Sequence, residues 1–440
     1  MYEILQAALI GSTVGIICGC VPGVGMFVAC AILYPILLDL QPVELLMFYT
    51  CMVCSAQYFG SVTAIYLGIA GEASSFPAVV EGYNLSKQGQ GQKAIFLTGV
   101  GSFIGTTFGL IAIGLMALAT ISLSLTSLEK SILFAIVGIS LIWTTKNKLT
   151  LDVFLIILAI GLCHIGYSGN TNIPLTYFDI LIFSQGIHFF PLCAGLLSMK
   201  EVLSAEDHSQ KELLSREKFL RIKSLFAHKW CILRGSLIGS LGGLLPGLTT
   251  ISASHLSYLA EKRIQNNYKP GNTFCLTSSE TANNAGSITQ LFPLLMFGIP
   301  ITGSEAIIYA MLDIKGWENS ANEVLGLLSN QWHLLLFVNL IALTLAIKFA
   351  KHFVKIVPNN NTLLKIVVFF ILCFTTYLVG ETTQGQGLFN MVLFWIATFI
   401  AWKTPRVNYI PFIFWMVVGH ILLDHFYTFL MINEYYAGAN

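Results

Sequence analysis

Eight uninterrupted apolar segments dominate this sequence, and most of them have the length of a helix that crosses a lipid bilayer, for which about 20 residues are needed. Only 10% of the 440 residues are charged, whereas a soluble domain carries about 25%. We therefore expect an all-α membrane protein that crosses the bilayer many times. The eight segments are Ile95–Ala119, Ser131–Thr145, Leu149–Gly166, Tyr177–Met199, Trp332–Ile347, Leu364–Val379, Leu388–Trp402 and Asn408–Ile432.

The basic residues of the short loops fit a single in–out alternation. Lys and Arg favour the cytoplasmic side, and none precedes Lys87, so we place the N-terminus outside. The tail 433–440 also lacks basic residues and falls outside, while the mixed-charge stretch 200–232 falls inside. The 23 basic and 22 acidic residues nearly balance, which does not favour nucleic-acid binding.

The ten cysteines lie mostly inside apolar segments, where cysteine behaves as a small apolar residue. Cys51 and Cys54 form a CxxC motif with no second ligand pair nearby, so packing is favoured over metal binding. The start Met1-Tyr2-Glu3 lacks the basic residues of a cleavable signal peptide, and none is expected.

The chain contains an internal repeat. The pattern G-S-x-x-G-x-x-x-G-x-x-P-G at Gly11–Gly23 returns at Gly235–Gly247. Two further blocks match in the same order, residues 60–63 with 286–289 and residues 68–70 with 298–300. Repeats at a fixed spacing indicate duplicated structural units.

The first copy begins outside and the second inside, so the two copies are predicted to be inverted. Inverted repeats recur in secondary transporters, with the substrate site at the repeat interface near the middle of the membrane. Each half is expected to contain a re-entrant hairpin, a broken helix and four continuous spans. The predicted units are the first repeat 1–199, the charged cytoplasmic connector 200–232 and the second repeat 233–440, with hairpins at 4–38 and 233–259 and broken helices at 43–80 and 275–312.

The breaks supply the chemistry for a ligand site. Non-helical backbone within a membrane is tolerated where it lines a cavity or is buried in protein, and helix N-termini there attract anions. Neither hairpin turn and neither break contains Lys or Arg, so we expect an anion to be held by hydroxyl, amide and backbone N–H groups. The candidate substrate ligands are Gly23, Ser61, Thr63, Gly247, Thr249, Thr250, Asn283, Asn284, Ser287 and Thr289.

A structural alternative stands beside this interpretation. Ser and Thr in membrane helices often bond to their own backbone or to a neighbouring helix. The small-residue spacing Gly11, Gly15 and Gly19 is also typical of close helix packing. Packing does not explain a Pro-Gly pair in the middle of an apolar segment in both halves.

Three acidic residues, Glu72, Glu280 and Glu305, lie near the breaks. An ionisable group within a membrane suggests function, and Glu72 and Glu280 are candidates for coupling to a cation. For Glu280 we favour a structural role, because Thr277-x-x-Glu280 has the pattern of a capping box at a helix start.

His420, Asp424 and His425 lie near the end of the last span. They could bind a metal or serve an intramembrane enzyme, but a third ligand on the same helix face is missing. A polar cluster at the membrane interface is therefore favoured, and no cofactor or resident metal is expected.

Several motifs resemble the large membrane subunit (TctA type) of tripartite tricarboxylate transporters. They are Gly19-x-x-Pro22-Gly23, Gly60-Ser61-x-Thr63-Ala64, Gly71-Glu72-Ala73-x-Ser75, Glu81-Gly82-Tyr83 with Lys87-Gln88-Gly89, Leu244-x-Pro246-Gly247, Glu280-x-Ala282-Asn283-Asn284-Ala285 and Pro293-Leu294-Leu295-x-x-Gly298-Ile299-Pro300.

The resemblance implies a bacterial inner-membrane permease, not an enzyme, that imports a di- or tricarboxylate with a sodium or proton gradient. It implies a small four-helix membrane subunit and a periplasmic solute-binding protein as partners, and an elevator-like motion; a homodimer is compatible with it. A stand-alone secondary transporter of another small organic anion is the alternative. Ala70 replaces the usual Pro, Ile301-Thr302 replace the usual Gly-Ser, and Glu305 is unexpected, departures that bear on the substrate.

Overall fold

The structure is a computed structural model of the 440-residue chain. It describes residues 2–21, 24–68, 73–121, 129, 132, 135–136, 139, 142, 147–165, 183, 186–204, 223–244, 250–265, 268–356, 361–384, 386–416 and 419.

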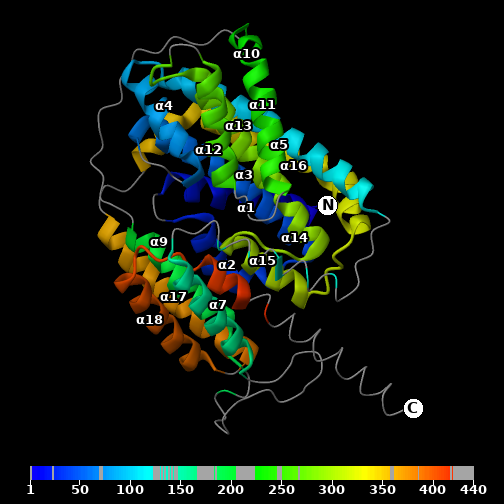
Figure 1. Ribbon diagram of the computed structural model, residues 1–440, viewed down its shortest axis with the longest axis vertical. Helices are drawn as coiled ribbons and strands as arrows, with labels where there is room; N and C mark the ends of the chain where they lie inside the picture. The colour runs from blue at the N-terminus through cyan, green and yellow to red at the C-terminus, as the bar shows by residue number, and fades with distance from the viewer. Residues whose placement is uncertain are drawn as a thin grey trace.

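The regular elements in this part of the chain are helices (Figure 1), which confirms the all-α prediction. The first half contains α1 (Tyr2–Cys20), α2 (Met26–Leu37), α3 (Pro42–Leu67), η1 (Ala73–Ser75), α4 (Phe76–Lys87), α5 (Gly91–Ala119), α7 (Leu149–Cys163), α8 (Phe189–Cys193), η4 (Ala194–Ser198) and α9 (Met199–Ser204). The second half contains α10 (Lys223–Ala227), α11 (Lys229–Leu244), α12 (Thr250–Ile264), α13 (Thr273–Thr289), α14 (Leu291–Phe297), α15 (Gly303–Ile314), α16 (Ala321–Ile356), α17 (Asn361–Gln384) and α18 (Gly387–Lys403).

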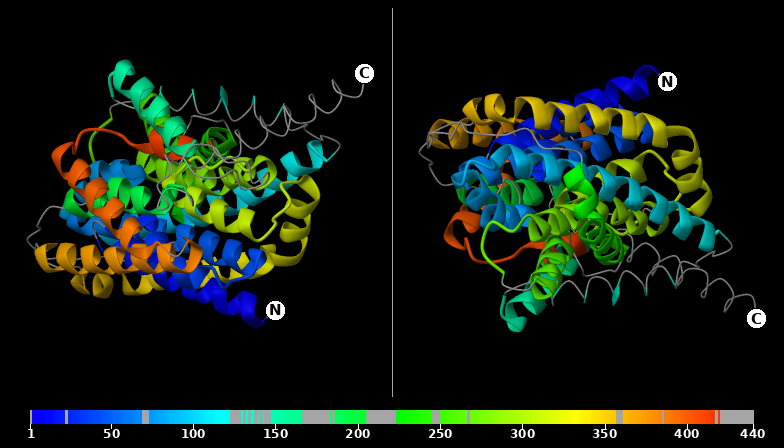
Figure 2. Two further views of the ribbon diagram at one scale, coloured as in Figure 1. Left: turned by 90° about the horizontal axis from the view of Figure 1, so that it is seen from below. Right: turned by 90° about the horizontal axis from the view of Figure 1, so that it is seen from above.

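The long helices have the character of membrane spans. Within the described residues, α1, α3, α5 and α16 are each long and apolar enough to cross a bilayer. The predicted continuous spans coincide with α5, α7, α16, α17 and α18. The predicted spans 131–145 and 408–432 lie largely outside the described residues. The prediction of a continuous span over 177–199 is wrong in its described part, because residues 186–188 are not helical and α8 begins at Phe189. Figure 2 shows α16 running along the molecule beside α1, which it contacts.

Glycines bring the first helix of each half into contact with the broken helix. A Cβ atom on Gly11 or Gly15 of α1 would lie 2.1 or 2.2 Å from a carbonyl oxygen of α3. In the second half, a Cβ on Gly235 or Gly239 of α11 would lie 2.5 or 2.3 Å from a carbonyl oxygen of α13. Only glycine permits backbones to approach this closely, so the repeated motif encodes the same helix pair twice.

The packing also corrects the register of the repeat. Gly19 of α1 lies over Ala56 of α3, and its counterpart Gly243 lies over Gly286 of α13. The structural counterpart of Gly286 is therefore Ala56, not Gly60 as the sequence match indicates. The two registers differ by one helical turn, which leaves the same face toward the neighbour.

Both predicted broken helices are interrupted, and a glycine marks each break. Helix α3 ends at Gly68 (φ 72°) and α14 ends at Gly298 (φ 71°), both in the left-handed conformation. Such a glycine ends a helix because it has no Cβ to clash. The chain resumes as η1 and α4 after the first break and as α15 after the second.

Each half contributes a long helix that packs against the broken helix of the other half. Helix α5 packs on α13, and α16 packs on α3. Helices α3 and α13 run antiparallel where they meet, since Gln57 contacts Ser287 while Ser61 contacts the earlier Glu280. Helices α5 and α16 are antiparallel as well, with Gly99 beside Leu343 and Gly114 beside Leu328.

The second arms of the two predicted hairpins lie in different surroundings. Helix α12 packs on α11 and α13, whereas α2 packs on α15 and α17 and touches α1 only slightly. Tyr34 of α2 lies 4.5 Å from Phe190 of α8 between ring centroids. Figure 1 shows α2 with α9, α15, α17 and α18 at one end of the molecule, away from α12. The first predicted hairpin is thus open in this structure.

Candidate functional site

Polar side chains gather where α3 and α13 cross. Gln57 Nε2 donates a hydrogen bond to Ser287 Oγ, and Ser61 Oγ donates one to Glu280 Oε2. Ser102 of α5 donates to the backbone oxygen of Glu280 at 3.4 Å. All of these side chains are buried, and neither α3 nor α13 contains Lys or Arg. The crossing is therefore a polar, acidic site inside an apolar bundle.

Glu280 is fully buried and only half bonded. Its Oε2 accepts from Ser61, but its Oε1 has no hydrogen-bond partner in the described chain. The capping box predicted for Thr277 and Glu280 is wrong, because α13 begins earlier, with Asn272 as its N-cap accepting from the backbone N–H of residues 274 and 275. Glu280 consequently lies on a helix interior turn that faces α3.

Two buried amides accompany this carboxylate. Neither Nδ2 nor Oδ1 of Asn283 is hydrogen-bonded to any part of the chain that the structure describes. Asn284 donates from Nδ2 to the backbone oxygen of Glu280 at 3.1 Å, and its Oδ1 is unpaired among the described residues. Burying an unpaired amide is costly. Asn339 and Asn390 share this feature, but Asn283 and Asn284 also lie within about one turn of the half-bonded Glu280, and this combination points to a ligand.

The first break is held by α12, which packs on α13. Ser254 Oγ of α12 donates to the backbone oxygen of Ser74 at 2.9 Å, which fixes η1 against α12. Ser75 Oγ is fully buried and has no partner within the described chain, and it does not cap α4. Thr250, at the start of α12, packs beside Gly286 of α13. Helix α12 and η1 both contact α13 and each other, so the first break lies beside the helix that carries Asn283.

The second break is closed by a side chain of its own. Glu305 Oε2 accepts from the backbone N–H of Ile301 at 2.7 Å and of Thr302 at 3.0 Å. Its Oε1 accepts from Gln290 Nε2 at 2.7 Å. Thr302 and Glu305 together form a capping box at the start of α15. The carboxylate thus fills the anion-binding end of this helix.

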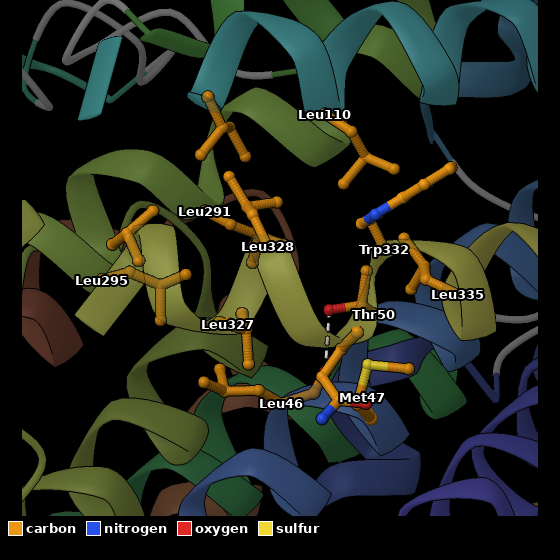
Figure 3. Close-up of a pocket in the computed structure, with 13 residues that line it drawn as sticks. Leu46, Met47, Thr50, Leu110, Leu291, Leu295, Leu327, Leu328, Trp332 and Leu335 are labelled. Atoms are coloured by element: carbon orange, nitrogen blue, oxygen red, sulfur yellow. Dashed lines mark hydrogen bonds between the residues drawn. The ribbon is translucent and has the colours of Figure 1, made fainter. Parts of the chain in front are cut away.

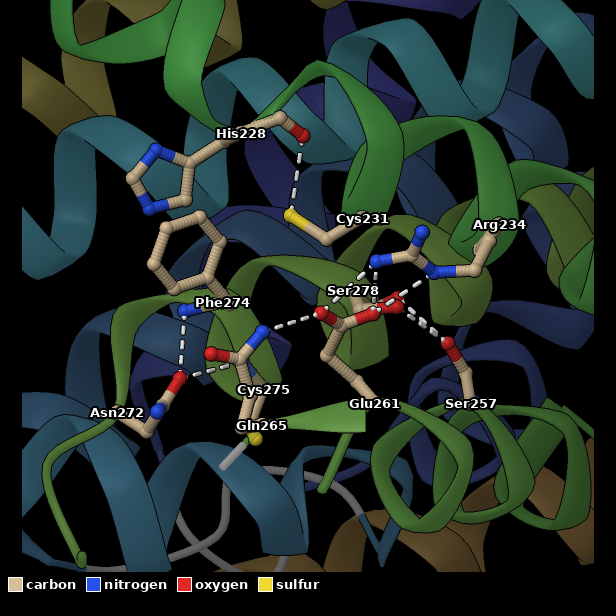
Figure 4. A network of polar contacts seen from close by, with 10 residues as sticks. All are labelled: His228, Cys231, Arg234, Ser257, Glu261, Gln265, Asn272, Phe274, Cys275 and Ser278. Atoms are coloured by element: carbon tan, nitrogen blue, oxygen red, sulfur yellow. Dashed lines mark hydrogen bonds and ion pairs between the residues drawn. The ribbon is translucent and has the colours of Figure 1, made fainter. Parts of the chain in front are cut away.

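A second polar network joins α4, α11, α12 and α13. Figure 4 shows Arg234 of α11 bound to Glu261 of α12, with three contacts of 2.8–3.0 Å. Gln265 Nε2 also donates to Glu261 at 2.8 Å. Arg234 lies at the start of the second predicted hairpin, but its charge is neutralised here by Glu261, in a bidentate pair of the strong kind.

Glu81 of α4 ties the two halves together next to this network. Its carboxylate accepts from Tyr258 Oη at 3.0 Å, from Tyr268 Oη at 2.6 Å and from the backbone N–H of Gly271 and Asn272 at 2.7 Å each. Burial, together with the hydrogen bond to Glu81, raises the pKa of Tyr268, so its hydroxyl stays a donor. Helices α4, α12 and α13 are therefore held as one unit.

The sequence profile described as the tripartite tricarboxylate transporter TctA family matches residues 5–414. The chain belongs to this family. An uncharacterized 52.8 kDa protein in the TAR-I ttuC' 3' region of Agrobacterium vitis is 25% identical, over 97% of this chain and 86% of that protein. An uncharacterized protein in the TAR-II ttuC' 3' region of the same organism is 25% identical, over 44% of this chain and 82% of that protein. No solved structure matches the chain.

Family membership makes this TctA-type chain a multi-pass membrane subunit of a tripartite tricarboxylate transporter. Among its predicted ligands, the crossing of α3 and α13 brings together Ser61, Asn283, Asn284 and Ser287. Thr63 instead bonds to the backbone of Gly60 and lies against α1, and Thr289 bonds to its own helix. The predicted residues Gly23, Glu72, Gly247, Thr249, His420, Asp424 and His425 lie outside the described residues.

Three residues of the site were not predicted from the sequence, namely Gln57, Ser75 and Gln290. Gln57 is the one amide side chain of α3, and an amide deep inside an apolar span is a usable signal. Ser75 is the last residue of the family motif after the first break, but nothing else in the sequence distinguishes it as a site residue. Gln290 is recognisable only through its contact with Glu305.

An apolar cavity lies near the crossing but does not suit a carboxylate. Figure 3 shows it between α3, α5, α14 and α16, walled mainly by leucines such as Leu46, Leu291 and Leu328, with Trp332 at one side. Thr50 is its polar neighbour, and the hydroxyl of Thr50 is bonded to the backbone of Leu46 at 2.7 Å. Gln331 and Trp332 add an amide and an indole N–H at the edge of the cavity, but its wall is otherwise apolar and holds no charged side chain among the described residues, so it suits a charged ligand poorly.

Proposed function

We propose that this TctA-family chain is the permease subunit of a carboxylate importer driven by sodium or protons. The substrate would bind where α3, α13, α12 and η1 meet. Asn283 carries this proposal, because it is fully buried on α13 with both polar atoms of its amide unpaired within the described chain. A ligand with hydrogen-bonding groups would satisfy it.

The site would hold an anion without a cationic side chain. The Nδ2 group of Asn283 and the hydroxyl of Ser75 are donors with no partner in the described residues. The N-termini of α4 and α12 add partial positive charge, which favours a carboxylate. Gly247 and Thr249 precede α12 and Gly23 lies in the first hairpin turn, so their assignment as substrate ligands remains part of this proposal. Glu72, which adjoins the first break, remains proposed as a cation-coupling residue.

Glu280 would couple transport to a cation. Asn284 Oδ1 and Glu280 Oε1 are oxygen acceptors that lack a partner among the described residues, and Ser61 Oγ is adjacent. Asn284 must present Oδ1 outward, because its Nδ2 donates to a carbonyl oxygen. A sodium ion or a proton here would neutralise a buried carboxylate, whose charge is otherwise costly.

We further propose the assembly that the family implies. It comprises a small four-helix membrane subunit and a periplasmic solute-binding protein, in the bacterial inner membrane, with both termini periplasmic. The antiparallel contacts of α3 with α13 and of α5 with α16 support inverted halves, the plan of alternating-access carriers. Transport, not catalysis, is the activity that this arrangement supports.

Uptake measurements test the proposal. Cells that express the chain with the partner proteins encoded beside it are supplied with radiolabelled gluconate, malate, tartrate and citrate, and the anion carried by the unmodified protein is then used. Asn283→Ala should lower its uptake by about tenfold or more, because an amide that bonds the substrate is lost.

Asn390→Ala is the matched control, since Asn390 of α18 is equally buried with an unpaired amide in the described chain. Uptake that depends on neither a cation gradient nor Asn283 would refute the proposal. Uptake by the chain alone in proteoliposomes would identify a stand-alone transporter.

A further inference from the structure

We propose that Glu305 is a specificity-determining residue that excludes a second carboxylate, so that the substrate is a hydroxylated monocarboxylate. This inference rests on the proposed function. It assigns the substrate a single carboxylate, in place of the two or three that the family resemblance implies. It follows from which hydrogen-bonding atoms remain unpaired at the two ends of the site.

The donors of the second break are already occupied. The N–H groups of Ile301 and Thr302 would suit a substrate carboxylate, but both donate to Glu305 Oε2. Gln290 Nε2 donates to the other oxygen of the same carboxylate. Glu305 is fully buried, so the chain supplies its own anion at this end.

The hydrogen bonds fix which way the neighbouring amides point. Gln290 must turn its Nε2 toward Glu305, because a carboxylate only accepts. Gln57 must turn its Nε2 toward Ser287, because the hydroxyl of Ser287 already donates to the backbone oxygen of Asn283 at 2.9 Å. Both amides therefore expose an acceptor, and the Oε1 atoms of Gln57 and Gln290 have no partner in the described chain.

The opposite end of the site offers donors. Asn283 and Gln290 lie on nearly the same face of α13 and its continuation, seven residues apart, which places them about 10 Å apart along the axis. At the Asn283 end, the Nδ2 group of Asn283 and the hydroxyl of Ser75 are unpaired donors within the described residues, next to the unpaired acceptors Asn283 Oδ1, Asn284 Oδ1 and Glu280 Oε1. The end beside the first break thus combines donors with acceptors, whereas Gln57 and Gln290 present acceptors alone beside the second break.

A substrate must match this polarity. A carboxylate fits the donors near Asn283 and Ser75, whereas a second carboxylate at the other end would face two amide oxygens with the Glu305 carboxylate behind them. Hydroxyl groups would donate to these oxygens and satisfy them. Buried groups built to bond a hydroxyl discriminate strongly against an analogue that lacks it.

Binding to the full chain, purified in lipid nanodiscs with sodium present, tests the inference. The probes are gluconate, glucarate and hexanoate, which share six carbons; glucarate adds a second carboxylate, and hexanoate lacks the hydroxyls. Calorimetry should find gluconate bound about tenfold or more tightly than either of the others. Glu305→Ala should raise the affinity for glucarate relative to gluconate by about tenfold, because it frees the N–H groups and Gln290.

Glu44→Ala is the matched control. Glu44 forms the corresponding capping box of α3, where its Oε2 accepts from the backbone N–H of Gln41 at 2.9 Å, and its removal should leave the affinity ratio unchanged. Glucarate bound as tightly as gluconate by the unmodified chain would overturn the inference while leaving the proposed function intact, even if Glu305→Ala does not fold. Binding of none of the probes would overturn it as well, and the Asn283 uptake experiment would then decide the proposed function separately.

Discussion

Helices α3 and α13 occupy corresponding places in the two halves, yet their corresponding residues differ in polarity. With Ala56 equivalent to Gly286, the counterpart of Glu280 is Thr50, which borders the apolar cavity. The counterparts of Asn283 and Asn284 are Val53 and Cys54, both buried in the hydrophobic core. The duplication preserves the helix packing through glycines, while the polar chemistry is concentrated on α13.

The second hairpin arms differ in a related way. Helix α12 stays on α13 beside the first break, whereas α2 leaves α3 and packs against α15, close to the second break. Gly303 of α15 is close enough to α2 that a Cβ atom there would lie 2.9 Å from Phe27. The first break keeps an unpaired Ser75, and the second is satisfied by Glu305. Within the described residues, the first break thus keeps an unpaired hydroxyl, whereas the donors of the second break are already bonded.

The largest effect should come from giving α13 the residue of its counterpart. Glu280→Thr removes the buried carboxylate but keeps a hydroxyl, and uptake driven by a sodium or proton gradient should fall by roughly 100-fold, because bonds to charged groups are the strong ones. The measurement is the initial uptake rate at several sodium concentrations and pH values.

Glu318→Gln, at an exposed position after α15, is the control and should transport normally. If the remaining uptake of Glu280→Thr still rises with the cation gradient as in the unmodified protein, Glu280 is not the coupling residue. The functional difference between α3 and α13 would then lie in the amides alone.

The next largest effect should come from disrupting the close helix contact at glycine that both halves share. Gly239→Ala would force a Cβ to within 2.3 Å of the Ala282 carbonyl oxygen, and Gly15→Ala to within 2.2 Å of the Met52 carbonyl oxygen. Each should destabilise the protein by about 1–3 kcal/mol, because the helices must separate. Thermal unfolding in detergent measures the loss.

Gly161→Ala is the matched control, because no atom of the described chain lies within 4 Å of a Cβ there, and α7 should gain slightly from the better helix former. Equal melting temperatures for all three variants would contradict the view that the glycine motif encodes close helix contact.

The sequence predicts the helices and their breaks well, because glycine and proline act locally on the backbone. The repeat was matched one turn out of register at Gly60, since a shift of one turn preserves the helix face and leaves similar residues aligned. The capping prediction at Glu280 failed because the pattern also occurs inside helices, and the earlier Asn272 caps α13 instead.

The site itself was predictable only in part. Asn283 and Asn284 are recognisable in the sequence as a pair of amides within a buried helix. Ser287 lies one helical turn after Asn283. The roles of Gln57 and Glu305 depend on their hydrogen-bond partners. Gln57 bonds to Ser287, which is distant in the sequence, and Glu305 bonds to the N–H of Ile301 at the second break. Such contacts depend on how the halves are packed, which residue spacing does not specify.

A smaller effect concerns the unit formed by α4, α12 and α13. Glu81→Gln leaves one oxygen but replaces the other with a donor, so the N–H groups of Gly271 and Asn272, or the tyrosine hydroxyls, lose their acceptor. We expect a loss of about 1–3 kcal/mol. Hydrogen exchange of residues 268–272 should accelerate, while exchange in α18 should not change.

The smallest effect concerns the link between the first broken helix and the second break. Tyr49 Oη and Ser304 Oγ share a hydrogen bond of 2.9 Å between α3 and α15. Tyr49→Phe and Ser304→Ala should each lower the free energy of unfolding by about 1 kcal/mol, and the double variant by little more than either, because both remove the same bond. Additive losses in melting experiments would contradict this coupling. If Tyr49→Phe binds gluconate as the unmodified protein does, the hydrogen bond between α3 and α15 is not needed for binding. The closure of the second break would then depend on the hydrogen bonds of Glu305.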